Sequence, residues 1–355
     1  MSPIRPSADT GGEAGATPVA ATPAAATPAA ATRVTAAGGG RAAVVLVLVA
    51  LAALIPLLGP STALRGTGEA AAPGVGGIAL LRAVLFAAVC VSAGELFAAR
   101  LARRVPGAPL EDAPRSWAPV AAAAGFVAAL GLASVVATGN LLPRRLSDMD
   151  IGGLYQTRDG MLALLVVNAF VVAGLCALSR RPATQVWPLA AVAVAEALRA
   201  HPATEDSPLI GSGLTLVHVT CAALWVGGLL HVLRMLRRWR ATAPGEGIAV
   251  LGLYARVAAL LFAAITVTGV CSTLRRMPAG SVLEQLTTTA YGRTLLAKVL
   301  LVVAVAALAL CARRRLRRSS DPLTAYSPAR AEVVFLGTVV ALSAALTALP
   351  VPIRW

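Results

Sequence analysis

The chain has 355 residues, 57% of them hydrophobic, and its mean hydropathy is +0.77. Charged residues make up only 13% of the chain and gather in short clusters between long apolar runs, which excludes a soluble globular protein. A net charge of +15 would indicate nucleic-acid binding in a soluble protein. Here we attribute it to basic loops on one side of a membrane, and we expect no nucleic-acid partner.

The N-terminal segment 1–40 is rich in Ala, Thr, Pro and Gly and contains the near-repeat ATPAAATPAAAT at 21–32. It has too few bulky apolar side chains to form a core, so we predict a disordered cytoplasmic leader. The apolar run at about 42–59 is either the first membrane span or part of a signal peptide cleaved near Ser61-Thr62-Ala63. The long, weakly basic leader favours the span.

Nine apolar runs approach the roughly 20 residues that a helix needs to cross about 30 Å of hydrocarbon. They lie at about 42–59, 77–99, 117–138, 160–178, 186–200, 209–233, 250–272, 294–312 and 331–349, and the fifth is the shortest. We therefore predict an all-α, polytopic transmembrane bundle of about nine spans, or eight if the first is cleaved. We divide the chain into the leader 1–40, N-terminal helices over 41–200 and a second group of helices over 201–355.

The basic residues predict the orientation of the spans. With the N-terminus inside, the inward segments include the arginine clusters at 100–104, 234–240 and 313–318. Basic residues on these inward segments outnumber those on the opposite side by about two to one, as the positive-inside rule requires. We expect a multi-pass protein of the cell membrane with its N-terminus in and its C-terminus out.

The cysteines occur singly in the predicted helices, without a CxxC pair, at Cys90, Cys176, Cys221, Cys271 and Cys311. This spacing predicts no disulfide framework. Four of the five are interpreted as small packing residues, and Cys221 is the exception.

The run 209–233 carries the most informative polar residues of the chain. His218, Cys221 and Trp225 follow one another at i, i+3 and i+7, so they share one helix face. An unpartnered polar group in hydrocarbon costs several kcal/mol, so these residues suggest a function. Imidazole and thiolate suit copper or zinc. Gly227 and Gly228 would let a neighbouring backbone approach closely.

Other candidate residues lie near the ends of the spans. His201 is predicted at the outer mouth, where a histidine is usually solvated, and His231 at the inner interface beside Arg234. Lys298 is the only lysine, and it either snorkels outward, neutralises a carboxylate or repels cations. Haem ligation competes with metal transport, but two bis-histidine haems need four histidines and the chain has 3.

Motifs of energised or hydrolytic chemistry are absent from the sequence: there is no Walker loop, HExxH, GxSxG or dinucleotide fingerprint, and no CPC-type copper-pump motif. We therefore expect neither an enzyme nor a nucleotide-driven pump.

Several segments together resemble the copper-resistance protein D family over roughly 195–353. They are His201 with His218-x6-Trp225-Val226-Gly227-Gly228-Leu229, Tyr254-Ala255-Arg256, Thr268-Gly269, the stretch from Thr288 through Tyr291 to Lys298, Arg330-Ala331-Glu332 and Pro350-Val351-Pro352. The resemblance implies a membrane protein that takes copper from the periplasmic side and moves it inward, aided by a separate periplasmic copper-binding protein. The chain departs from it in having only 5 methionines and no Met-rich or His-rich stretch.

Under this hypothesis His201 and Met277 receive copper outside, and His218 with Cys221 forms a transient site above Trp225. Tyr291 and Lys298 have supporting positions. Two alternatives stay open: a membrane scaffold that delivers copper to, or assembles, a respiratory oxidase, and a haem or quinone redox protein.

Overall fold

The structure is a computed structural model that describes residues 50–70, 73–139, 141–143, 145–201, 207–277, 279–318 and 326–350. Over these residues every regular element is a helix and no strand occurs, which confirms the all-α prediction. The predicted leader 1–40 and the segment 351–355 lie outside the described residues.

Each apolar run from residue 77 onward forms a helix. These helices are α2 (Val75–Ala102), α3 (Ala118–Ala137), α5 (Arg158–Leu178), α6 (Val186–Arg199), α7 (Pro208–Arg238), α8 (Pro244–Arg276), α10 (Ala290–Arg318) and α11 (Tyr326–Ala348). The first run is described from residue 50 onward, as the helix Ala50–Leu64. That helix contains Ser61-Thr62-Ala63, the segment considered above as a cleavage region.

Short helices that the sequence pattern did not predict occupy the loops. They are α4 (Ile151–Gln156), α9 (Val282–Thr288) and the 3-10 turns η1 (Leu110–Asp112), η2 (Leu146–Asp148) and η3 (Pro182–Gln185). The helix ends follow local chemistry. Pro208 and Pro244 begin α7 and α8, where a missing N–H costs nothing. The side chains of Asp150 and Thr157 accept hydrogen bonds from the first-turn amides of α4 and α5.

Six helices, α2, α3, α5, α7, α8 and α10, are long and apolar enough to cross a membrane. Large apolar side chains such as Leu175, Leu260 and Leu300 are exposed on their outer faces, as lipid contact requires. Helix α6 has 14 residues and measures about 21 Å, which is less than the hydrocarbon thickness. The chain is therefore a multi-pass helical membrane protein, and the nine-span count stays a prediction.

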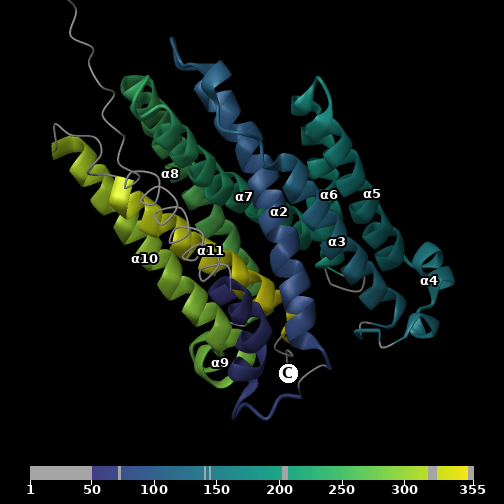
Figure 1. The fold of residues 1–355 in the computed structure, drawn as a ribbon. Helices are drawn as coiled ribbons and strands as arrows, with labels where there is room; N and C mark the ends of the chain where they lie inside the picture. The colour runs from purple at the N-terminus through teal and green to yellow at the C-terminus, as the bar shows by residue number, and fades with distance from the viewer. Residues whose placement is uncertain are drawn as a thin grey trace, which may run out of the picture. The chain divides into compact units, whose positions relative to one another are not determined.

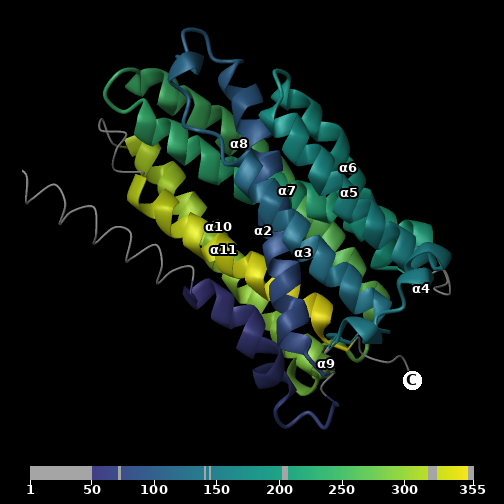
Figure 2. The same cartoon turned by 45° about the vertical axis from the view of Figure 1, so that its right-hand side comes forward.

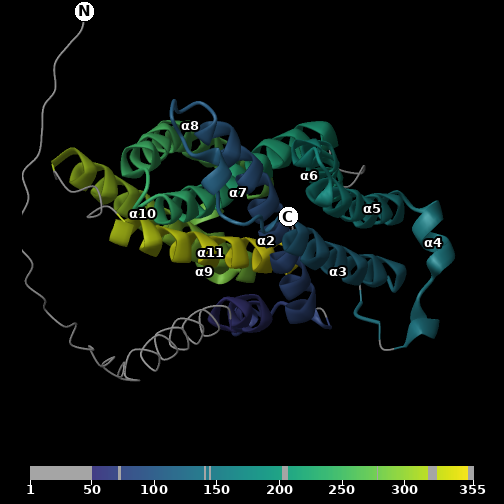
Figure 3. The same cartoon turned by 45° about the horizontal axis from the view of Figure 1, so that its top comes forward.

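Helix α2 is the central element of the described bundle. It packs against α3, α7 and α11, and Figures 1 and 2 show it between the α3–α5–α6 group and the α10–α11 pair. Figure 3 shows the long helix pair α7 and α8 along the same bundle. The central position of α2 brings residues of both halves of the sequence into contact with this one helix.

Helices α2 and α7 touch through their backbones at Gly94 and Gly227. A methyl group on Gly227 would overlap the Cys90 carbonyl and the Gly94 backbone, and one on Gly94 would overlap Gly227. A side chain on Gly228 would meet the rings of Phe97 and Tyr254 at about 3 Å. The close approach predicted for the Gly-Gly pair is confirmed.

Candidate functional site

A cavity of about 210 Å³ lies between α2, α7, α8, α10 and α11. Its α8, α10 and α11 residues belong to the helix ends that the predicted orientation places outside. The polar residues that line it are Cys90, Thr215, His218, Ser272, Thr273, Arg276, Tyr291, Lys298, Ser343 and Thr347. The rest of the lining is apolar and includes Phe86, Val89 and Leu295. A mostly apolar cavity with a few polar and charged groups is typical of a ligand site.

His218 is oriented by a hydrogen bond between its Nδ1 and the Thr268 hydroxyl, 3.0 Å long. That hydroxyl lies 2.7 Å from the carbonyl of Ala264 and donates its only proton to it. The hydroxyl oxygen must therefore accept from His218, which assigns the proton to Nδ1. Nε2 then carries a lone pair, so this cavity-lining histidine can act as a neutral metal ligand.

The cysteine that lines the cavity with His218 is Cys90 of α2. It is buried, and its carbonyl packs against Gly227. Cys221 is half-buried, does not line this cavity, and packs against the apolar cluster around Trp225 and Leu229. The i, i+3 spacing that linked Cys221 to His218 thus does not bring both side chains to the cavity.

Lys298 and Arg276 give the cavity its positive charges. Lys298 lines the cavity. The Arg276 guanidinium donates to the Tyr291 hydroxyl at 3.1 Å and lies 5.9 Å from the centre of that ring. Among the described residues no Asp or Glu lines the cavity, so no lining carboxylate offsets these charges.

The two residues predicted at the outer entrance are both buried. His201 is only 4% exposed, its ring lies against Gly211, and its Nε2 is 2.9 Å from the hydroxyl of the cavity-lining Thr215. A solvated loop histidine is therefore the wrong description of it. Met277 is 0% exposed and packs with Tyr291 at the end of α8. His201 and Met277 both contact residues that line the cavity, but neither of them lines it.

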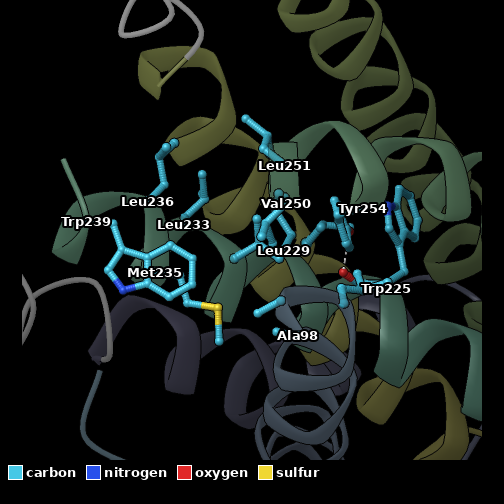
Figure 4. Close-up of a cluster of buried hydrophobic side chains, with 14 of the residues drawn as sticks. Ala98, Trp225, Leu229, Leu233, Met235, Leu236, Trp239, Val250, Leu251 and Tyr254 are labelled. Atoms are coloured by element: carbon cyan, nitrogen blue, oxygen red, sulfur yellow. Dashed lines mark hydrogen bonds between the residues drawn. The ribbon is translucent and has the colours of Figure 1, made fainter. Parts of the chain in front are cut away.

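Trp225 lies in the apolar cluster between α2, α7 and α8, which Figure 4 shows. Its ring packs edge-on against Phe262 with 5.4 Å between centroids. Its carbonyl accepts a hydrogen bond of 2.6 Å from the Tyr254 hydroxyl. The indole does not line the cavity, so its role in the structure is to pack α7 against α8.

His231 belongs to a buried polar group near the ends of α2 and α7 that the predicted orientation places inside, and its interfacial location stays a prediction. It is 3% exposed. Its Nδ1 accepts from Arg234 at 3.0 Å, so Nε2 carries the proton and donates to the carbonyl of Val91 at 3.0 Å. The Arg234 guanidinium also lies 3.7 Å from the centre of the Trp117 ring, and Glu95 accepts from the Trp117 amide at 2.9 Å. These contacts join α2 and α7 to the start of α3.

Within the described part of the chain, no three His, Cys, Asp or Glu residues gather in a group that could hold a metal ion. A resident, fully coordinated metal centre therefore has no support there, whereas a site of one or two soft ligands is compatible with the cavity. Sequence reasoning missed Cys90 and Arg276, because nothing in their local pattern distinguishes them from packing and interfacial residues.

Apolar helices around a cavity that is lined in part by polar side chains define the class of the chain as a polytopic membrane protein. Residues 248–346 match the family model described as Copper resistance protein D. The match confirms, over this part of the chain, the resemblance to copper resistance-related membrane proteins seen in the sequence. Met277, Tyr291 and Lys298 lie within the matched segment, and His201 and His218 precede it. No curated protein and no solved structure matches the chain.

Proposed function

We propose that the chain transports copper inward across the cell membrane and that copper binds transiently in the cavity beside His218 during transport. The observation that carries the proposal is the hydrogen bond to Thr268, because it leaves Nε2 of a cavity-lining histidine with a lone pair. The match of residues 248–346 to a copper-resistance family model makes copper the expected cargo.

We propose Cys90 as the sulfur ligand in place of Cys221. Cys90 shares the cavity with His218, and thiolate and imidazole are both ligands that copper accepts. Two soft donors bind more weakly than a full coordination shell, and transport needs a site that also releases the ion.

His201 and Met277 have accessory roles in the proposed copper entry. His201 contacts Thr215 and Met277 packs against Tyr291, so both adjoin lining residues on the side that the predicted orientation places outside. A separate periplasmic copper-binding protein would deliver copper at this end.

Three variants test the proposal through copper accumulation in cells and copper uptake by proteoliposomes. We expect His218→Ala and Cys90→Ser to lose most of the uptake. Cys221→Ser is the matched control because it changes the same atom type one turn from His218, outside the cavity, and it should retain wild-type uptake. Membrane levels of each variant are measured in parallel. Uptake by His218→Ala equal to that of the wild type would reject the proposal.

A further inference from the structure

The cavity contains two cationic side chains, and its lining has no acidic partner for them in the part of the chain that the structure describes. Lys298 and Arg276 both line it. Nearby carboxylates are engaged elsewhere: Glu196 pairs with Arg199 at 2.8 Å, and Glu69 accepts from the Ala290 amide at 3.2 Å. A third cation, Arg82, donates to the carbonyl of Thr347 at the cavity wall, 2.6 Å away.

Both cationic side chains are only partly exposed, and like charges that share a cavity repel each other. A counter-ion stabilises cations that are partly withdrawn from water. Lys298 has no hydrogen-bond or ion-pair partner among the described residues. An anion between Lys298 and Arg276 would satisfy both charges.

The neutral donors around the cavity favour an oxyanion. The Tyr291 hydroxyl accepts from Arg276, so its own proton is available to another acceptor. Ser272 adds a second hydroxyl to the lining. The guanidinium fork matches the geometry of phosphate and carboxylate oxygens. The volume of about 210 Å³ is several times the roughly 30 Å³ that a water molecule occupies, so a small oxyanion fits.

We infer that the cavity binds a small oxyanion, of the phosphate type, between Lys298 and Arg276, with Tyr291 and Ser272 as additional donors. This site goes beyond the proposed copper transport and does not require it. An anion held there would offset the two charges near His218 and so lower the electrostatic cost of placing a copper cation in the same cavity. The phosphate group has two sources, free phosphate and the headgroup of an anionic lipid.

Because Lys298 is the only lysine of the chain, its reaction with an amine-specific reagent reports on this cavity. The full chain is purified in an uncharged maltoside detergent, and labelling of Lys298 is measured by peptide mass spectrometry, which separates it from the N-terminal amine. Inorganic phosphate is added in one arm and phosphatidylglycerol in another, with sodium chloride at equal ionic strength as the reference. We expect either inorganic phosphate or phosphatidylglycerol to slow the labelling of Lys298 at least about threefold. The one that does so identifies the source of the bound phosphate group.

The variant Arg276→Gln should lose this protection. Arg275→Gln is its matched control, because Arg275 lies next to it but donates to Ser207 and does not line the cavity. A second readout is the thermal unfolding temperature, which the effective anion should raise in the wild type and not in Arg276→Gln. Absence of a rise from either anion, or an equal loss in both arginine variants, would overturn the inference. The outcome is independent of copper uptake by His218→Ala.

Discussion

The tautomer of His218 that leaves a lone pair on Nε2 depends on a single neighbour, Thr268. The hydroxyl proton of Thr268 is donated to the carbonyl of Ala264, so its oxygen accepts from Nδ1. The pair joins α7 to α8 and fixes both the tautomer and the ring orientation of the histidine. Orientation of a ligating histidine through its second nitrogen is a common feature of metal sites.

Replacement of Thr268 tests this arrangement. Thr268→Val keeps the shape of the side chain but removes the acceptor for Nδ1, so we expect copper uptake to fall by about 10-fold or more, as for other partners of ligating histidines. Thr268→Ser retains the hydroxyl and should stay close to the wild type. If both variants transport equally, the hydrogen bond has no part in copper handling.

The polar group around His231 has a structural role by the same reasoning. In His231→Ala the guanidinium of Arg234 and the carbonyl of Val91 lose a buried partner, which costs about 1–3 kcal/mol. We expect a lower unfolding temperature in detergent. The exposed Arg237 on the same helix offers the control Arg237→Ala, which should unfold like the wild type. A variant of His231 as stable as the wild type would contradict this role.

Sequence pattern identified some of the residues around the cavity and could not identify others. His218 and Lys298 were recognisable because each is a costly side chain within an apolar run. Cys90 was not, since a lone cysteine in a helix has many uses, and its place in the cavity depends on a helix crossing more than a hundred residues along the chain. Helical spacing placed Cys221 on the face of His218 but carried no information about which neighbour each side chain meets.

At the scale of the helices, the crossing of α2 and α7 sets how closely Cys90 and His218 can approach. The crossing depends on Gly94 and Gly227, whose backbones are in contact. Any side chain at this point must push the two helices apart, and the cavity wall moves with them.

Gly227→Ala should therefore destabilise the chain by about 1–3 kcal/mol, the usual cost of an extra group in a packed interface, and should also reduce copper uptake. Gly213→Ala is the control on the same helix: nothing lies within 4 Å of the added methyl group, and a gain of about 0.5–1 kcal/mol is expected from helix propensity. Unfolding in detergent compares the two variants. Equal stability of both would show that the crossing tolerates a side chain.

The helix bounds were largely predictable, because the hydropathy of a run and the prolines and caps at its ends are local properties. The eight runs from residue 77 onward correspond to α2, α3, α5, α6, α7, α8, α10 and α11. The short helices α4 and α9 were not predicted, since six or seven residues of mixed polarity give no clear period. Helix packing was not predictable either, because apolar faces suit lipid and protein equally well.

For the whole molecule, the distribution of arginines predicts which ends of the helices face the cytoplasm. In a chain without other cysteines, Gly280→Cys should react in intact cells with a maleimide that cannot cross the membrane, and Ala241→Cys should react only after the cells are opened. Both positions are exposed; Ala241 precedes the start of α8 and Gly280 follows its end. Labelling with the reverse pattern would invert the orientation and place the cavity toward the cytoplasm.

The contact of Gly94 with Gly227 has a mechanical consequence. Cys90 and His218 precede Gly94 and Gly227 along their helices, and His231 and Arg234 follow Gly227. At the contact itself two backbones meet, and on either side of it apolar side chains of α2 and α7 belong to common clusters, Cys90 with Ala223 and Ala98 with Leu229. A displacement of α7 at Gly227 would therefore be transmitted along α2 toward both ends of the helix pair.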